Sequence, residues 1–513
     1  MQMIDATPTP TRFTRALLAL ERGGNRLPDP ATLFVIIGLL VLLGSWIGSA
    51  YGWSVIDPRD STKQIVVDNL LDAESMRWIW TSALKNFLDF PPLAIVLVAM
   101  LGIGVAERTG LFPALLKLLV QTTPARLMTP AIIFIGVNSS AAADSGYVVL
   151  PPLAAGVFAM LGRSPLVGIA AAVFGIAGGF SANIAITSLD PLLSGLTEQA
   201  AQTIDPSAVV SPTANYAFMF VSTFFLTALG WLVTAKIVEP RFSPQVVARQ
   251  IEQGGVLHAD ARLHPLERRG LLAALIAFVL AGGAFLSMAL VEGGPLTGIV
   301  TRHATNTLAP AWSEALVPII LVMFLLPGVA YGITAGEIRS DRAVADRMGQ
   351  SIASMGTYIV IAFFAGQSIA WFRQSNLAVV MSVEGAEIIR SLNLGQGIMI
   401  VAIVWGVAVL DLFLASASAK WVFLAPVLVP MLASAGMPPD LVQAAYRVGD
   451  SCVNPIAPLN AYLVIVLIVI RRYDNRAGLG TLLALLAPYS LAALLGWTAL
   501  LIAWNALGIP LAF

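Results

Sequence analysis

Residues 138–144 read NSSAAAD and residues 415–421 read ASASAKW, and both small-polar clusters lie inside stretches that are otherwise apolar. Each cluster is followed by an apolar run with proline, then by a loop, and then by an asparagine in a second apolar stretch. These asparagines are Asn183 in the first copy and Asn454 in the second. A duplicated pair of interrupted apolar segments is typical of the binding site of a secondary transporter.

The composition of the chain is that of a membrane protein. Of its 513 residues, 58% are hydrophobic and only 11% are charged, whereas soluble globular proteins carry about 25% charged residues. The 29 basic and 29 acidic residues balance, which argues against a nucleic-acid partner. The single cysteine, Cys452, excludes an intramolecular disulfide and a cysteine metal cluster. The three histidines occur in polar stretches that we predict as loops, so a histidine metal site inside the membrane is not expected.

Nine stretches are long or apolar enough to cross a bilayer, which takes roughly 17–25 residues per helix. The predicted spans are Ala31–Ala50, Pro92–Ala106, Leu166–Ser188, Tyr216–Val238, Gly270–Val291, Leu316–Ile333, Ala353–Trp371, Leu441–Ile470 and Gly480–Trp504.

Two further apolar regions, Met128–Met160 and Ile398–Met431, are broken in the middle by the small-polar clusters. A continuous helix would expose those polar side chains to lipid. Two half-helices that meet at a tip would instead place them in a cavity, where non-helical backbone is tolerated at membrane depth. The sequence therefore predicts an all-α polytopic membrane protein with about nine transmembrane helices and two re-entrant helical hairpins in an inverted repeat.

The distribution of basic residues predicts the orientation. With the N-terminus in the cytoplasm, most of the 29 Lys and Arg residues fall on the cytoplasmic side, as the positive-inside rule requires. The first hairpin then opens to the cytoplasm and the second to the outside. The expected organisation is a cytoplasmic N-terminal segment (1–30), a first membrane half (31–238) with hairpin 128–160, a cytoplasmic connector (239–269), and a second membrane half (270–513) with hairpin 398–431.

Charged side chains inside the predicted membrane segments are functional candidates, because a charge is costly there. Arg447 is suited to bind a carboxylate, since its guanidinium fork matches carboxylate geometry. In the alternative interpretation, Arg447 and Asp450, three residues apart on one helix, simply neutralise each other. We expect Asp190 and Asp450 to bind a coupling ion or a proton. The full set is Asp144, Asp190, Asp411, Lys420, Arg447 and Asp450.

Oxygen-bearing side chains near the two breaks form a second group of candidates. Their oxygens suit Na⁺ or a hydrogen-bonded substrate, whereas helix-kink packing is the structural alternative. Half-helix N-termini at the hairpin tips would add partial positive charge for an anionic group. No cofactor is expected, and Na⁺ and H⁺ both fit as coupling ions. The predicted ion-binding residues are Asn138, Ser140, Asp144, Asn183 and Asn454, with Na⁺ placed at the three asparagines.

Four strings resemble the AbgT family of p-aminobenzoyl-glutamate transporters, and the resemblance covers nearly the whole chain. They are NSSAAADSGYVVLPP (138–152), SANIAITSLDP (181–191), SASAKWVFLAPVLVP (416–430) and YRVGDSCVN (446–454). The resemblance implies a homodimer whose protomers have nine spans and two hairpins. It also implies ion-coupled transport of p-aminobenzoyl-glutamate, a folate breakdown product, and in some members efflux of sulfonamide antimetabolites.

The resemblance also implies which residues bind substrate. At position 411 the family usually has asparagine, whereas this chain has Asp411, and a carboxylate can hold a cation or a proton where an amide cannot. We expect Arg447 to engage the substrate carboxylate and Trp421 to border its aromatic ring. The matched positions are Asp190 in SLDP, Ser418 and Trp421 in SASAKW, Arg447 and Asp450 in YRVGD, and the flanking prolines Pro439 and Pro458.

Three other functions compete with this interpretation. An ion-coupled dicarboxylate or short-chain fatty acid transporter of the same architecture is the nearest. An intramembrane hydrolase is disfavoured, because the sequence has no GxSxG turn, no intramembrane histidine and no metal-ligand cluster. A channel is disfavoured by the duplicated broken helices. We therefore expect a multi-pass transporter of the bacterial inner membrane, not an enzyme, whose partners are an aromatic carboxylate substrate and the lipid bilayer.

Overall fold

Helices dominate the computed structural model of the chain, which describes residues 30–57, 60–139, 145–187, 189–254, 263–301, 308–412, 416–457, 460 and 462–512. The prediction of a helical chain with several apolar helices is confirmed, whereas the count of nine spans and two re-entrant hairpins stays a prediction. The chain is not purely helical, however. Two short antiparallel β-hairpins are present, β1 (Ser54–Asp57) with β2 (Asp60–Val66) and β3 (Ile299–Thr301) with β4 (Leu308–Pro310). In β1 and β2, β-branched residues such as Val55 and Ile65 pair across the strands.

The helices of the first part of the chain are α2 (Pro30–Ala50), α3 (Ala73–Leu88), α4 (Pro91–Arg108), α5 (Leu111–Thr122), η1 (Ala125–Leu127), α6 (Met128–Asn138), α7 (Ser145–Met160), α8 (Pro165–Val173), η3 (Phe174–Gly178), α9 (Leu189–Ala201), α10 (Tyr216–Val233), η4 (Thr234–Val238), η5 (Glu239–Arg241) and α11 (Pro244–Gly254). Those of the second part are α12 (Pro265–Leu290), α13 (Ala311–Glu314), α14 (Leu316–Ala335), α15 (Asp341–Ser354), α16 (Gly356–Gln374), α17 (Leu377–Ser391), α18 (Gln396–Asp411), α19 (Ala417–Ser434), α20 (Pro439–Val453), η6 (Asn454–Ile456), α21 (Tyr462–Tyr473) and α22 (Leu479–Ala506).

Several helices have the length and apolar composition of a membrane span. Four of them coincide with predicted spans to within a few residues, and a fifth is the second arm of the predicted hairpin 398–431. They are Tyr216–Arg241, Pro265–Leu290, Leu316–Ala335, Leu479–Ala506 and, in the hairpin, Ala417–Ser434. The region of the predicted hairpin 128–160 likewise forms two helices, α6 and α7, on either side of the polar cluster.

Two predicted spans are wrong as continuous helices. The predicted span Leu441–Ile470 is divided, because α20 ends at Val453 and α21 begins only at Tyr462. Pro455 lies in this interruption, and a proline has no amide hydrogen with which to continue the helical ladder. The predicted span Leu166–Ser188 ends as a helix at Gly178, in a π-helical turn that contains two glycines. Glycine is the weakest helix former apart from proline, and π-turns are common at functional sites.

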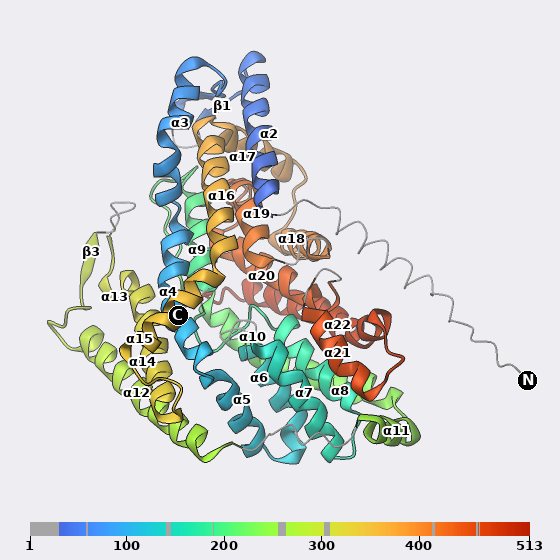
Figure 1. Cartoon of the computed structure of the whole chain (residues 1–513). Helices are drawn as coiled ribbons and strands as arrows, with labels where there is room; N and C mark the ends of the chain where they lie inside the picture. Colours follow the sequence, from blue (N-terminus) through green and yellow to red (C-terminus); the bar gives the residue numbers. More distant parts are fainter. Residues whose placement is uncertain are drawn as a thin grey trace, which may run out of the picture.

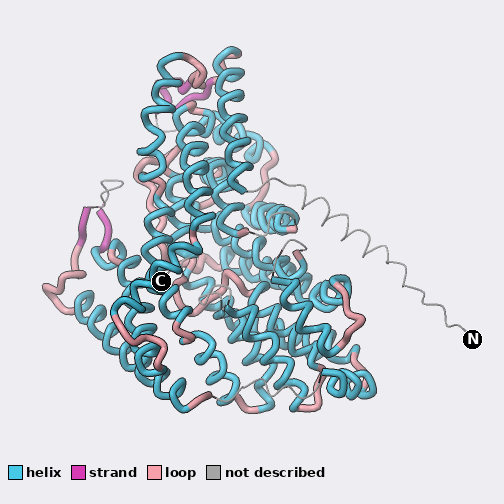
Figure 2. The backbone as a smooth tube through the Cα atoms, viewed as in Figure 1, coloured by secondary structure: helices cyan, strands magenta, loops and turns pink. Residues whose placement is uncertain are grey.

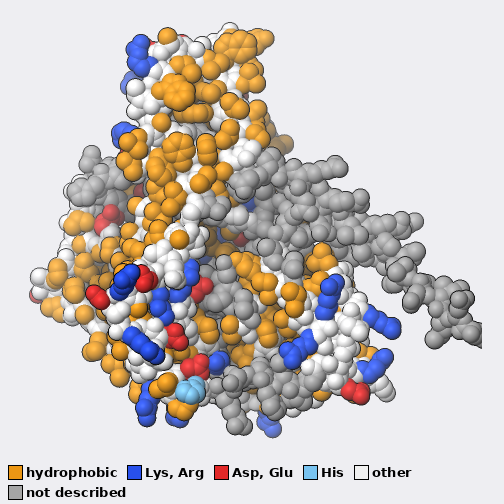
Figure 3. Space-filling model, viewed as in Figure 1, with side chains coloured by type: hydrophobic (Ala, Val, Ile, Leu, Met, Phe, Trp, Pro, Cys, Tyr) orange, Lys and Arg blue, Asp and Glu red, His pale blue; other side chains and the backbone are white. Residues whose placement is uncertain are grey.

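The molecule has an elongated part and a broader part (Figure 1). The elongated part contains α2, α3, α16 and α17, with the β1–β2 hairpin at its tip, and the broader part contains α5 to α8, α10, α21 and α22. Figure 2 shows the two strand pairs at the periphery, away from the centre of the helical assembly. Hydrophobic side chains cover much of the elongated part, whereas Lys and Arg gather along the lower rim of the same view (Figure 3).

Helix α20 lies at the centre of the packing. All of its residues from Leu441 to Val453 are buried, and it packs against α9, α18, α19 and α22. The contact with α18 is close because Gly449 has no side chain. A Cβ atom at this position would lie 2.4 Å from the carbonyl oxygen of Val404 on α18. Gly449 therefore sets the separation of the two helices next to the polar residues described below.

We expect Gly449→Ala to lower the melting temperature of the detergent-purified protein, since overpacking against backbone costs about 1–3 kcal/mol. Gly406→Ala on α18 is the matched control, because nothing lies within 4 Å of its added Cβ. This control should be neutral or slightly stabilising, because alanine is the better helix former. Equal melting temperatures for the two variants would contradict the close α18–α20 contact.

Candidate functional site

The two interrupted segments of the sequence lie against each other in the fold. In the first copy, η3 is followed by non-helical backbone from Gly179 to Thr187; in the second, η6 follows α20. A Cβ atom added at Gly178 would lie 3.3 Å from Cγ of Pro455, so the two breaks are in contact. Residues that are far apart in the chain thus meet where both helices are broken.

Side chains of α20 bind the backbone of the first break. The hydroxyl Oγ of Ser451 accepts a hydrogen bond from the Ser181 amide at 3.2 Å, and Arg447 Nη2 donates to the Ser181 carbonyl at 2.8 Å. Broken helices free backbone groups that must be satisfied internally in a membrane protein. Here Arg447 and Ser451, from the second copy, are the hydrogen-bond partners of the freed backbone at Ser181 in the first copy.

Arg447 forms a buried ion pair with Asp190 at the start of α9. Its Nη1 lies 2.7 Å from Asp190 Oδ1. The other oxygen of Asp190, Oδ2, accepts hydrogen bonds from the amide and hydroxyl of Thr187, at 2.7 and 2.9 Å. Arg447 is 2% exposed and Asp190 is 8% exposed. The alternative that Arg447 and Asp450 neutralise each other is therefore wrong for this structure: Arg447 pairs with Asp190, and Asp450 pairs with Lys420.

Two hydrogen-bond donors beside this ion pair have no acceptor among the described residues. They are Nε of Arg447 and Oγ of Ser181, both buried. A buried donor without a partner is costly, at about 1–3 kcal/mol, and is rare in folded proteins. The pair of donors is therefore a feature that points to a function.

Lys420 links two carboxylates. Its Nζ forms an ion pair with Asp411 at the end of α18 and lies 2.6 Å from Oδ1 of Asp450 on α20. All three residues are at most 1% exposed. The second oxygens of Asp411 and Asp450 have no hydrogen-bond donor within the described ranges. Three helices therefore meet at one ammonium group.

Trp421 is completely buried, next to Lys420 on α19. Its ring stacks on the ring of Tyr446, with centroids 4.3 Å apart and an interplanar angle of 29°. Its Nε1 donates a hydrogen bond to Oγ1 of Thr197 at 3.0 Å. Tyr446 in turn donates to the carbonyl of Ala417, in the first turn of α19. In this structure the ring therefore packs against a residue of its own chain, and its expected contact with a substrate stays a prediction.

Sequence reasoning missed a chain of polar residues that continues from Trp421. Thr197 donates to Oε1 of Gln443 at 2.6 Å, and Gln443 Nε2 donates to Oδ1 of Asn215 at 2.8 Å. Asn215 then donates to the carbonyl of Asp440 at 2.8 Å. The sequence contained one indication of this polar chain: Gln443 lies four residues before Arg447 and therefore on the same face of the helix.

The three asparagines that we expected to bind Na⁺ lie at or beside the two breaks. Asn138 is the last residue of α6; its Oδ1 accepts a hydrogen bond from the Ile184 amide at 3.0 Å, so it ties the first hairpin to the first break. Asn183 lies within that break, and Asn454 opens η6. No group of three or more His, Cys, Asp or Glu side chains that could hold a metal ion occurs in the part of the chain that the structure describes.

The remaining predicted residues lie at helix ends or outside the described residues. Ser418 is in the first turn of α19, with Oγ 3.4 Å from Oγ of Ser416, the N-cap residue of that helix. Pro439 is the first residue of α20, where a proline suits the helix start. Ser140, Asp144 and Pro458 lie outside the described residues.

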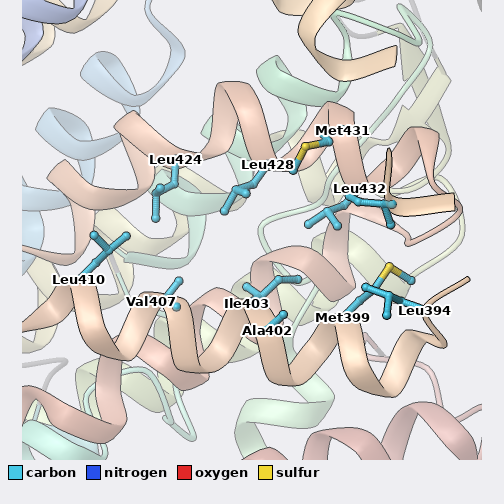
Figure 4. Close-up of a pocket in the computed structure, with 12 residues that line it drawn as sticks. Leu394, Met399, Ala402, Ile403, Val407, Leu410, Leu424, Leu428, Met431 and Leu432 are labelled. Carbon is cyan, nitrogen blue, oxygen red and sulfur yellow. The ribbon is translucent and has the colours of Figure 1, made fainter. Parts of the chain in front are cut away.

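An apolar cavity of about 310 Å³ separates α18 from α19 (Figure 4). Leu410, Val407 and Ile403 of α18 face Leu424 and Leu428 of α19 across it. All of its lining residues are apolar, so it offers no donor for a carboxylate. The charged residues described above are instead closed off from solvent.

Comparison with known proteins gave consistent matches over nearly the whole chain. A family model of the AbgT transporter family matches residues 15–513. The p-aminobenzoyl-glutamate transport protein of Escherichia coli (strain K12) is 34% identical over 496 residues, which are 96% of this chain and 95% of that protein.

Two solved structures are also similar. The YdaH transporter of Alcanivorax borkumensis has a TM-score of 0.86 and 38% identity, over 95% of this chain and 100% of that one. MtrF of Neisseria gonorrhoeae, from a class described as antimetabolite efflux pumps, has a TM-score of 0.89 and 38% identity, over 96% of this chain and 97% of that one.

We expect Thr197→Val to lower the free energy of unfolding by about 1–3 kcal/mol, because Trp421 and Gln443 both lose a buried hydrogen-bond partner. Thr223→Val is the matched control: Thr223 is equally buried, but its hydroxyl bonds the backbone carbonyl of Met219 in its own helix. Thermal unfolding of both variants measures the difference. If the two substitutions had equal effects, the chain from Thr197 to Asn215 would not contribute to stability.

Proposed function

Because the chain belongs to the AbgT transporter family, we propose that it moves p-aminobenzoyl-glutamate or related aromatic carboxylates across the membrane, driven by a Na⁺ or proton gradient. Members of this family are transporters, so the chain is a membrane transporter and not an enzyme. The substrate and the coupling gradient are the parts that we propose.

The observation that carries the proposal is the pair of unsatisfied donors at Arg447 and Ser181. The guanidinium of Arg447 already binds Asp190 through Nη1 and the Ser181 carbonyl through Nη2. Its Nε–H and the Ser181 hydroxyl have no acceptor among the described residues. A carboxylate offers several acceptor positions and a negative charge, and so it suits this pair of donors.

Asp190 supplies the counter-charge of Arg447 when no substrate is bound. A buried guanidinium without a counter-charge would be strongly unfavourable, so Asp190 stabilises Arg447 while the site is empty. A substrate carboxylate would add a second negative charge beside the guanidinium. Binding would therefore weaken the Arg447–Asp190 pair, which links α20 to α9, and would favour a rearrangement between these helices.

We propose the finer architecture on the same grounds. Nine transmembrane helices and two re-entrant hairpins would form two inverted halves, 31–238 and 270–513, joined by a cytoplasmic connector at 239–269. The contact between the two breaks and the paired half-helices α6–α7 and α18–α19 support this plan. The Lys and Arg side chains along the lower rim in Figure 3 support placing that rim on the cytoplasmic side of the membrane. The assembly would be a homodimer in the bacterial inner membrane.

A second function, export of sulfonamide antimetabolites, is favoured by one specific finding. MtrF, at 38% identity over 96% of this chain, is described as belonging to a class of antimetabolite efflux pumps. Sulfonamides share the aromatic amine of p-aminobenzoyl compounds, so one apolar ring site could accept both. The same carrier could perform both activities in opposite directions, because a carrier follows its gradients.

Uptake of radiolabelled p-aminobenzoyl-glutamate into proteoliposomes tests the proposed function, with Na⁺ and proton gradients applied separately. We expect saturable uptake driven by one of the two gradients. No uptake under either gradient, from protein that elutes as a single folded species, would contradict the proposed substrate.

In the same assay we expect Arg447→Ala to reduce uptake at least roughly thirty-fold, since loss of one partner in a buried charged hydrogen bond costs about 2–5 kcal/mol. Arg447→Lys keeps the charge but loses the guanidinium fork, and it should recover only part of the activity. Arg339→Ala is the control: it removes an exposed arginine in the loop between α14 and α15, and this variant should transport normally. Retained uptake by folded Arg447→Ala would exclude the proposed role of Arg447.

A further inference from the structure

We propose that Asp411 and Asp450, which both contact Lys420, share one exchangeable proton and form the proton-coupling site of this transporter. The proposal rests on the proposed transport function and deepens it, because it selects the coupling ion and names where that ion binds.

The argument begins with a count of buried charges. Arg447 and Asp190 balance each other as one ion pair. Lys420, by contrast, has two carboxylate partners, Asp411 and Asp450. If all three groups were ionised, the cluster would hold one uncompensated negative charge at 0–1% exposure. An uncompensated buried charge is so unfavourable that the group takes up a proton instead.

The atoms left without partners support the same conclusion. Oδ2 of Asp411 and Oδ2 of Asp450 accept no hydrogen bond from any described residue. Two ionised carboxylates would leave both oxygens buried, charged and unsatisfied. A proton on either oxygen removes the excess charge and turns that oxygen into a donor. Two carboxylates that share a site commonly ionise one at a time.

Among the residues that the structure describes, the surrounding helices supply no further positive charge. On α20, the Tyr446 hydroxyl lies within hydrogen-bond reach of the Ala417 carbonyl and, at 3.4 Å, of Asp450 Oδ1, but it carries no positive charge. Arg447 is bound to Asp190, and Cys452 is buried. On α9, Glu198 accepts a hydrogen bond from the Val210 amide. On α17, the charged side chains are exposed: Glu384, Glu387 and Arg390. In α22, Tyr489 hydrogen-bonds with Thr234 instead.

The geometry favours a proton over Na⁺ as the bound ion. The ammonium of Lys420 already occupies the position between the two carboxylates that a metal ion would need. A second cation beside it would be repelled and would need a shell of oxygen ligands. A proton needs only one oxygen. The Asp411–Lys420–Asp450 cluster can therefore bind H⁺ without displacing any side chain.

The position of the cluster explains how a proton could control movement. Asp411 is on α18 and Asp450 is on α20, and these two helices are closely packed at Gly449. Lys420 is on α19, so it ties α19 to the α18–α20 pair. When one carboxyl is protonated, a single charged contact remains; when the proton leaves, both are charged. Protonation therefore changes the strength of the link between α19 and its neighbours, three residues from Arg447.

Infrared difference spectroscopy of the purified full-length protein tests the proton itself, without any substrate. We expect the carbonyl stretch of a protonated carboxyl at neutral pH, and we expect Asp411→Asn to abolish it, because Lys420 and Asp450 then balance. Glu387→Gln, which removes an exposed carboxylate on α17, is the control and should keep the band. If the wild-type protein lacks the band, or if Asp411→Asn retains it, the proposal is wrong. Should Asp411→Asn fail to fold, Asp450→Asn provides the same comparison.

Proteoliposomes that contain a pH-sensitive dye test the coupling. Addition of p-aminobenzoyl-glutamate to the wild-type protein should move protons, whereas Asp411→Asn should lose this movement and the surface control Glu387→Gln should keep it. Proton movement that persists in Asp411→Asn, or uptake driven by Na⁺ alone, would overturn the coupling role. Absence of labelled uptake by the wild-type protein would instead count against the proposed substrate, and the infrared result would still decide whether the cluster holds a proton.

Discussion

The burial of charge in a medium without water is the constraint on which this structure depends. An ionised side chain at membrane depth must have a partner, and the partner must come from a helix close enough to supply it. Arg447 and Asp450 are three residues apart on α20, yet each pairs with a different neighbour, Asp190 of α9 and Lys420 of α19. These two ion pairs therefore specify which helices surround α20 and in what rotation about its axis.

Much of this arrangement could be predicted from the sequence, because charged and small-polar residues in an apolar chain must be kept away from lipid, which few structures allow. The polar clusters at 138–144 and 415–421 predicted interrupted helices, and the structure has a helix on each side of both clusters. Asp190, Lys420, Arg447 and Asp450 were identified as candidates from their position alone, and the structure brings all four into two adjacent buried groups. Long apolar helices such as Leu316–Ala335 were predicted almost to the residue, since lipid requires a minimum span.

The pairing itself could not be predicted, because it depends on the rotation and separation of helices. Spacing on one helix suggested that Arg447 and Asp450 neutralise each other, but tertiary packing pairs Arg447 with Asp190 and Asp450 with Lys420. The contacts of Trp421 could not be predicted for a similar reason, because its partners Thr197 and Tyr446 come from two other helices. Leu441–Ile470 was predicted as one span because its hydropathy is continuous, whereas Pro455 ends the helical hydrogen bonding within it.

The apolar space between α18 and α19 divides what the sequence presents as one hairpin. Helix α18 packs against α20 and α22, while α19 packs mainly against α9 and α17. The space between them is lined only by apolar side chains, whereas polar contacts join the two arms at both ends of α18: Asp411 pairs with Lys420, and Gln396 donates to the carbonyl of Gly436. A movement of one arm past the other therefore has to break these polar contacts, while the apolar side chains between them offer little resistance to sliding.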